Sequence, residues 1–169
     1  MSLFIASQIL ISIAICTDLL SFQFKNRTHI VACLAVSCLL ISIHFMCLGH
    51  WTAACLSLLN STRFFTTIFS TARVLMWIYL SITMLVFFFT YEGHLSVLGT
   101  IGALFGTVAS FSKNDKRLRE IMFVGTCFWL AHNILAGSPG AVVMEIIFIS
   151  SNIVGYYRYY IRRPKQILK

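Results

Sequence analysis

The residues best suited to chemistry in this sequence lie within long apolar stretches. Trp129, His132 and Asn133 occur in one such stretch, and Glu145 and Asn152 occur in the next. Residues three, four or seven positions apart share one face of an α-helix, so each group predicts a polar helix face. Two such faces in contact would offer an aromatic surface, amide groups and a His–Glu pair around one cavity. That combination is typical of sites that bind small polar solutes.

Other polar residues stand alone within, or near the ends of, apolar stretches, and inside a membrane such residues are by default candidates for function. Small-solute binding is predicted for Asn60, Trp129, His132, Asn133, Glu145 and Asn152. Proton coupling is predicted for His44, His132 and Glu145, because an imidazole exchanges a proton near neutral pH. A gating or anchoring role is predicted for Asp18, Arg63 and Arg158.

Most of these side chains also have a structural explanation. An Asn inside a membrane commonly hydrogen-bonds to a neighbouring helix, at about 0.6 kcal/mol on average. His44 and His132 lie close enough to the ends of their stretches to bond to a turn, and Asp18 can pair with Lys25 or Arg27. Both interpretations stay open at the level of sequence.

The composition indicates that these stretches face lipid. Of the 169 residues, 59% are hydrophobic and 11% are charged, whereas a soluble domain carries about 25% charged residues. A surface that faces water cannot be built from so few charges. The net charge of +8 does not indicate nucleic-acid binding, since the basic residues form short blocks between apolar runs.

No enzyme, metal site or cofactor is predicted. The six cysteines contain no CxxC pair, and the chain has no HExxH, no GxSxG and no paired-carboxylate motif.

A bilayer core about 30 Å thick needs about 20 apolar residues per helix, and its lack of water requires the backbone to be helical. Seven spans are predicted near 3–22, 30–48, 51–69, 74–91, 95–111, 119–136 and 141–160. With seven spans, all 13 Lys and Arg fall on one side of the membrane. Because Lys and Arg stay on the cytoplasmic side, we expect the amino terminus outside and the basic tail, 161–169, inside.

A shift of 88 positions brings several features of the chain into register. The matching residues are Lys25-Asn26 with Lys113-Asn114, His44 with His132, Gly49 with Gly137, and Ala53 with Ala141. The sequence therefore predicts an all-α membrane protein built from two three-helix repeats, about 3–69 and 95–160, joined by a linker helix at 74–91. Because the lone linker helix restores the orientation, the repeats run parallel about an axis along the membrane normal, as in the SWEET sugar transporters.

The motif WxxHNxxAGSxG, which begins at Trp129 and is followed by Glu145 and Asn152, resembles the YgjV family. Further matching residues are His44-Phe45, Leu48-Gly49, Leu59-Asn60, Arg63 and Arg158. The resemblance implies a bacterial inner membrane protein without an established biochemical activity. A distant similarity of that family to the SWEET and PQ-loop group would imply the same three-plus-one-plus-three architecture. The chain departs from the PQ-loop pattern, because it has no Pro-Gln pair, and this puts a proline hinge in doubt.

Two functions remain open at this point. The first is transport of a small polar solute by alternating access, with a proton as the candidate coupling ion. The alternative is a non-transporting membrane scaffold or regulatory subunit, whose polar residues only hold helices together. The expected partners are the lipid bilayer and an unidentified solute, and a homo-oligomer is left open.

Overall fold

The computed structural model describes residues 3–21, 27–112 and 114–162, and within these ranges the chain is helical without strands. The elements are α1 (Leu3–Ser21), α2 (Arg27–Cys47), α3 (Trp51–Phe69), α4 (Arg73–Phe89), α5 (His94–Ser110), α6 (Asp115–Leu135), α7 (Pro139–Tyr156) and the π-helix η1 (Tyr157–Ile161). The predicted all-helical fold is confirmed. Lys25, Lys113 and most of the predicted tail, 163–169, lie outside the described residues.

The helix bounds differ from the predicted spans mainly in the last two helices. We expected the sixth span to begin near 119, but α6 begins at Asp115. We expected α7 over 141–160, but it begins at Pro139 and continues into η1 after Tyr156. The early start has a local cause, because the Ser138 side chain accepts a hydrogen bond from the backbone N–H of Ala141 and caps the helix. Proline suits the first helical position because it lacks the N–H that would have no partner there.

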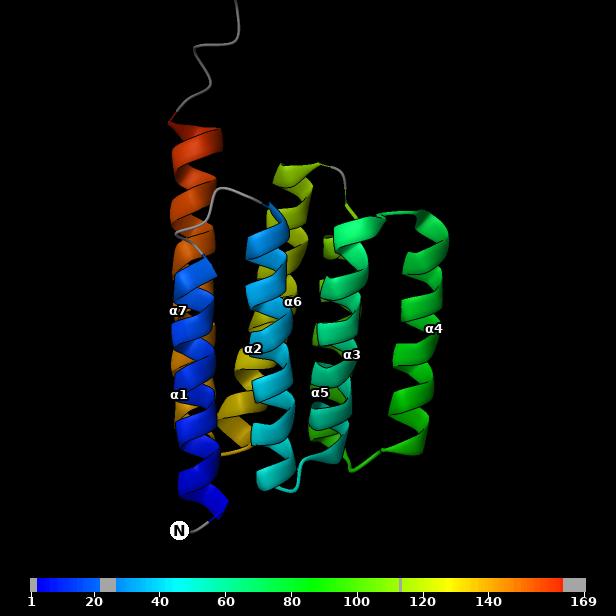
Figure 1. The fold of residues 1–169 in the computed structure, drawn as a ribbon, viewed down its shortest axis with the longest axis vertical. Coiled ribbons are helices and arrows are strands. Elements are labelled where there is room, and N and C mark those ends of the chain that lie inside the picture. Colours follow the sequence, from blue (N-terminus) through cyan, green and yellow to red (C-terminus); the bar gives the residue numbers. More distant parts are fainter. Residues whose placement is uncertain (1–2, 22–26, 113, 163–169) are drawn as a thin grey trace, which may run out of the picture.

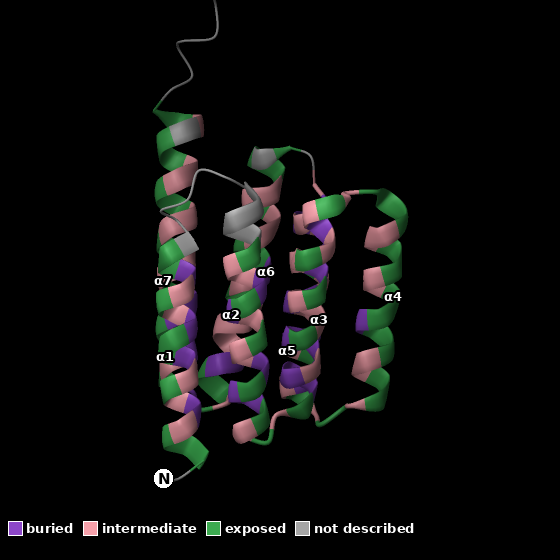
Figure 2. Cartoon of the chain, in the orientation of Figure 1, coloured by how far each residue is buried: buried purple, intermediate pink, exposed green. Residues whose placement is uncertain are grey.

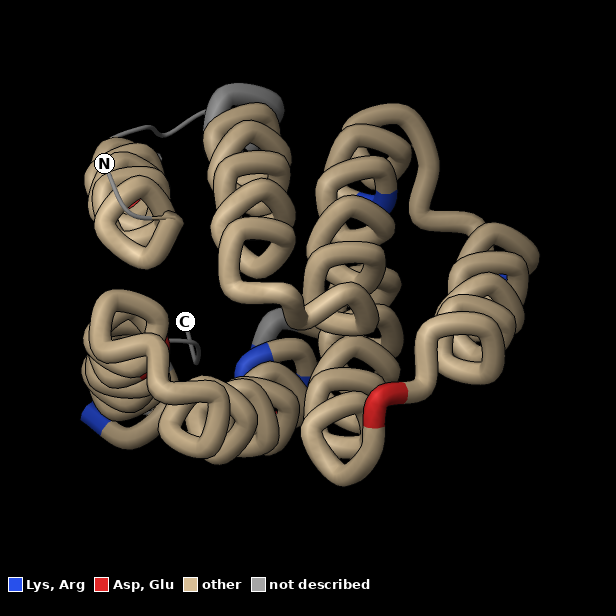
Figure 3. The backbone as a smooth tube through the Cα atoms, turned by 90° about the horizontal axis from the view of Figure 1, so that it is seen from below, with Lys and Arg blue, Asp and Glu red and all other residues tan. Residues whose placement is uncertain are grey.

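The helices form two rows of three with α4 to one side (Figure 3). Successive helices run in opposite directions (Figure 1), so α1, α3, α5 and α7 share one direction. One row contains α1, α2 and α3, and the other contains α7, α6 and α5. The rows touch at both ends, where α1 packs on α7 and α3 packs on α5, while α4 packs on α3 and α5.

Polar residues are concentrated among the buried positions of the bundle, and large hydrophobic residues among the exposed ones. Figure 2 shows where the buried and exposed positions lie on the helices. Among the described residues, the buried hydrophobic ones are mostly alanine, whereas the buried polar ones include Ser, Thr, His, Asn, Arg and Glu. Outward-facing residues include Phe88 and Phe89, which are 70% and 86% exposed. A water-soluble bundle has the opposite distribution, so this one is built for an apolar surrounding.

By length and composition alone, two of the described helices are long and apolar enough to cross a membrane, at Leu3–Leu20 and Pro139–Tyr156. Shorter apolar segments lie at Ala32–Cys47, Arg73–Phe89 and His94–Ser110. The other two helices are more polar because α3 contains Arg63 and α6 begins with a charged turn.

Glycines allow α5 and α6 to pack unusually closely. A Cβ atom at Gly102 would lie 2.7 Å from Cδ1 of Trp129 and 3.1 Å from the carbonyl oxygen of Gly125. A Cβ atom at Gly125 would in turn lie 3.1 Å from the carbonyl oxygen of Gly102. The Trp129 ring therefore occupies space that any larger residue at Gly102 would need.

We expect Gly102→Ala to destabilise the protein by about 1–3 kcal/mol, because the added methyl group overpacks this contact. Gly99→Ala on the same helix is the matched control. Its Cβ atom would meet Trp129 at 3.5 Å, an ordinary van der Waals distance, and alanine favours the helix by about 1 kcal/mol. Thermal unfolding in detergent measures both variants. Equal melting temperatures for the two would contradict this account of the helix contact.

Candidate functional site

A central cavity of about 130 Å³ lies between the two rows of helices. Its lining comes from every helix except α4. Residues of the predicted site that line it are Asp18, Asn60, Arg63, Trp129, Asn133 and Glu145. A water molecule takes up roughly 30 Å³ in the liquid, so the cavity has room for a small solute or a few waters.

Of the described residues that line the cavity, Arg63 is the only basic one, and it is 3% exposed. Its Nη1 atom donates to Oγ1 of Thr107 at 2.7 Å and to the carbonyl oxygen of Ala103 at 3.5 Å. Its Nε atom is buried and has no hydrogen-bond partner among the described residues. A buried nitrogen of this kind costs about 1–3 kcal/mol unless something satisfies it. Within the described part of the chain, Arg63 forms no ion pair.

Gly106 allows Arg63 to take up this position. The guanidinium lies over α5 at Gly106, where an added Cβ atom would be in ordinary van der Waals contact with Nη2, at 3.5 Å. A larger side chain at that point would occupy the space that the guanidinium fills. α5 therefore contributes small residues that make room for the charge on α3.

Two acidic residues line the opposite end of the cavity, on α1 and α7. Asp18 is 5% exposed and interacts with the Ser37 hydroxyl group, and Glu145 is 8% exposed. The Nδ2 atom of Asn133 donates to Oε1 of Glu145 at 3.5 Å, and Nδ1 of His132 donates to Oδ1 of Asn133 at 3.1 Å. His132, Asn133 and Glu145 therefore form one chain of polar contacts that ends in the cavity.

An aromatic cluster forms another part of the lining. The rings of Phe45 and Trp129 stack with their centroids 6.2 Å apart, and His132 packs edge-on against both, at 5.4 Å and 5.3 Å. This cluster joins α2 to α6, the middle helices of the two rows, near the ends of both helices. It provides an apolar surface beside the charged residues.

Asn60 and Asn152 have different surroundings. Asn60 lines the cavity, and no hydrogen bond from its side chain occurs among the described residues. Asn152 lies away from the cavity lining, and its Nδ2 atom donates to the carbonyl oxygen of Arg119 at 2.8 Å. The structure thus gives Asn152 a contact between α6 and α7, of the kind that holds helices together.

His44 is fully buried outside the cavity lining and connects three segments. Its Nδ1 atom lies 2.8 Å from the carbonyl oxygen of Ser7, and its Nε2 atom lies 3.0 Å from Oγ of Ser138. Since a carbonyl only accepts, Nδ1 must carry the proton, and Nε2 then accepts from Ser138. The neutral ring satisfies both contacts, so the geometry describes a structural role that ties α2 to α1 and to the α6–α7 turn.

Comparison with known proteins identifies the family. The model of the family Imp-YgjV, described as bacterial inner membrane protein, matches residues 5–163. The chain belongs to this family. It is also 26% identical over 148 residues to inner membrane protein YgjV of Escherichia coli strain K12, covering 88% of this chain and 81% of that protein. No solved structure matches the chain.

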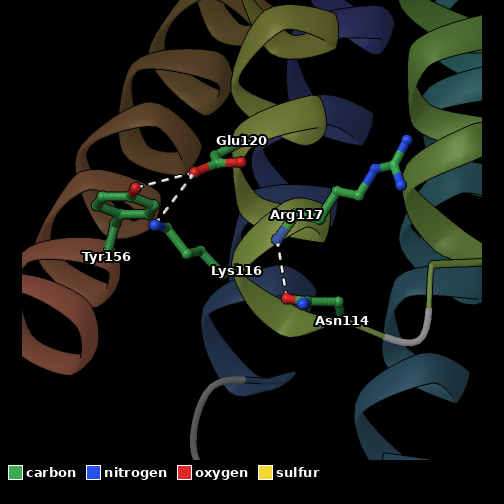
Figure 4. A network of polar contacts seen from close by, with 5 residues as sticks. All are labelled: Asn114, Lys116, Arg117, Glu120 and Tyr156. Atoms are coloured by element: carbon green, nitrogen blue, oxygen red, sulfur yellow. Dashed lines mark hydrogen bonds and ion pairs between the residues drawn. The ribbon is translucent and has the colours of Figure 1, made fainter.

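The end of this YgjV-family bundle where α1, α3, α5 and α7 finish carries a network of polar contacts (Figure 4). Nζ of Lys116 lies 4.0 Å from Oε1 of Glu120, which also accepts from the Tyr156 hydroxyl at 2.9 Å. Asn114 caps α6 by accepting from the N–H of Arg117. Arg158, predicted as a gate or anchor, is exposed in η1 near this end and is absent from the cavity lining.

Several lining residues were missed in the sequence because they are small or apolar. They are Ser37, Cys38, Phe45, Ser57, Gly102, Gly106 and Thr126. Two signals were available: the spacing of three and four between Gly99, Gly102 and Gly106, and the positions related to other lining residues by the 88-residue shift. In the described residues, no group of three or more His, Cys, Asp or Glu side chains could hold a metal ion.

We expect Ser138→Ala to destabilise this YgjV-family protein by about 1–3 kcal/mol, because it removes the partner of a buried imidazole nitrogen. The same change deprives the N–H of Ala141 of its acceptor. Ser81→Ala, at an exposed position on α4, is the control and is expected to change little. Thermal unfolding of both variants in the same detergent makes the comparison. Identical melting temperatures for Ser138→Ala and the unaltered protein would refute the structural role of His44.

Proposed function

We propose that this protein is a small-solute transporter that works by alternating access around the central cavity. The observation that carries the proposal is the relation between the cavity and the internal repeat. In transporters of this class, the solute site lies at the interface of two repeats near the middle of the membrane.

The helix bounds support the repeat. A shift of 88 moves Arg27–Cys47 onto 115–135, the bounds of α6, and moves Trp51–Phe69 onto 139–157, within one residue of α7. Gly49 and Gly137, which the shift superimposes, both adopt positive φ, of 77° and 65°. Matching turns in the left-handed region favour glycine at both places.

The residues that line the cavity are also related by the shift of 88 positions. Eight pairs of its lining residues are 88 positions apart: Asp18 and Gly106, Leu34 and Met122, Ser37 and Gly125, Cys38 and Thr126, Ile41 and Trp129, Phe45 and Asn133, Ser57 and Glu145, and Asn60 and Phe148. All the lining residues of α2 thus pair with all those of α6. This pairing supports a cavity on an approximate two-fold axis between the repeats, where rocking of one repeat against the other would open it to each side in turn.

The surroundings of the polar residues favour transport over the scaffold. A scaffold needs its polar residues only for helix contacts, and His44 and Asn152 have such contacts. Asn60, Arg63 and Glu145 instead line one cavity. His132 and Glu145, linked through Asn133, are the proposed proton-coupling pair.

We expect Asn60→Leu and Glu145→Gln to lower solute flux about tenfold or more, since each removes a polar contact available to the solute. Asn152→Leu is the comparison variant, expected to keep the flux and to lose only about 0.6 kcal/mol of stability. Flux of a broad panel of labelled small solutes into vesicles containing the purified protein measures this. No flux for any solute, or normal flux with Glu145→Gln, would contradict transport and favour the scaffold.

We also propose that the carboxyl terminus lies in the cytoplasm. In the described residues, Arg73, Lys116, Arg117, Arg119 and Arg158 all lie in or near the end of the bundle where α1, α3, α5 and α7 finish, and Lys and Arg favour the cytoplasmic side.

We expect green fluorescent protein fused to the carboxyl terminus to fluoresce in a bacterial host and alkaline phosphatase at the same place to be inactive. Each reporter works on only one side of the inner membrane, so the two fusions control for one another. An active phosphatase with a dark fluorescent protein would reverse the proposed orientation.

A further inference from the structure

The charged residues of the cavity are separated by sign. The acidic residues Asp18 and Glu145 are on α1 and α7, which pack together at one end of the two rows. The basic residue Arg63 is on α3 and rests on α5, at the other end. Figure 3 shows these two helix pairs at opposite sides of α2 and α6. We call these the acidic end and the basic end of the cavity.

The two ends do not neutralise each other directly. Neither Asp18 nor Glu145 forms an ion pair with Arg63 in the described part of the chain. Cys38, on α2 between the two ends, also lines the cavity. The space between the opposite charges is therefore the cavity itself.

Each end has a charged side chain that a solute can supply with a hydrogen-bonding or charged partner. Nε of Arg63 is buried and finds no partner in the described ranges of the chain, and a guanidinium binds a carboxylate with two parallel hydrogen bonds. At the acidic end, Glu145 receives only the long contact from Asn133 among the described residues. A carboxylate inside a membrane needs a positive partner or a donor.

We propose that the cavity binds a small zwitterion that carries both a carboxylate and an ammonium group. Its carboxylate meets Arg63 at the basic end, and its ammonium group meets Glu145 and Asp18 at the acidic end. Its aliphatic part lies against the ring of Trp129. A solute with a single charge satisfies one end and leaves the other exposed to the apolar surroundings. This inference names the solute class of the proposed transporter. It rests on the proposed function for the role of the bound solute, whereas the binding itself can be tested without transport.

The test compares three probes of nearly equal length: 4-aminobutyrate, butyrate and butylamine. Binding to the full chain in lipid nanodiscs is measured by isothermal titration calorimetry. 4-Aminobutyrate is expected to bind about tenfold or more tightly than either singly charged probe, because it gains a second charge-assisted contact. If butyrate or butylamine binds as tightly as 4-aminobutyrate, or if none of the three binds, the proposal is overturned.

Variants of the charged residues test which group of the solute binds at each end of the cavity. In Arg63→Met, 4-aminobutyrate is expected to bind no more tightly than butylamine, and in Glu145→Gln it is expected to lose most of its advantage over butyrate. Arg73→Met and Glu120→Gln, at exposed positions on α4 and α6, are the matched controls and keep the preference of the unaltered protein. The comparison of the three probes on the unaltered protein stands even if Arg63→Met fails to fold.

Measuring binding and flux separately distinguishes a failure of this inference from a failure of the proposed function. Zwitterion binding without flux in vesicles supports the site and overturns transport. Flux that is restricted to uncharged or singly charged solutes supports transport and overturns the zwitterion site.

Discussion

Lipid offers no hydrogen bonds, so every polar group in this chain that leaves the membrane surface must find a partner inside the bundle. The backbone meets this requirement by forming helices. The side chains meet it through a polar interior, where His44 uses both ring nitrogens and Asn152 binds a backbone carbonyl. Among the described residues, two buried side-chain atoms lack a hydrogen-bond partner: Oγ1 of Thr100 on α5, and Nε of Arg63 in the wall of the central cavity.

The cavity depends on where the helices approach closely and where they do not. Glycines bring α5 against α6 at Gly102 and Gly125, and Gly140 does the same for α7 against Ile11 of α1. α2 and α6, in the middle of the two rows, meet through the rings of Phe45 and Trp129. The charged residues line the space between this aromatic contact and the ends, where α1 packs on α7 and α3 packs on α5.

The helices could be predicted from the sequence because long apolar runs broken by turn residues permit little else in lipid. The convergence of Asn133 and Glu145 also followed from helical spacing and one motif. The different surroundings of Asn60 and Asn152 could not be predicted. An Asn in an apolar run gives the same sequence pattern whether its side chain faces a cavity or binds a backbone carbonyl. The contribution of α5 was missed for a related reason, because Gly102 and Gly106 act by leaving room for Trp129 and Arg63.

The charge separation has a simple origin if the two halves arose by duplication. The position equivalent to Asp18 in the second half is Gly106, where the absence of a side chain makes room for the Arg63 guanidinium. The position equivalent to Glu145 in the first half is the uncharged Ser57. The helix arrangement is thus similar in the two halves, whereas the charged residues differ between them. In the proposed transporter, the approximate symmetry would suit a rocking motion between two similar states, and the unequal residues would orient a dipolar solute within the cavity.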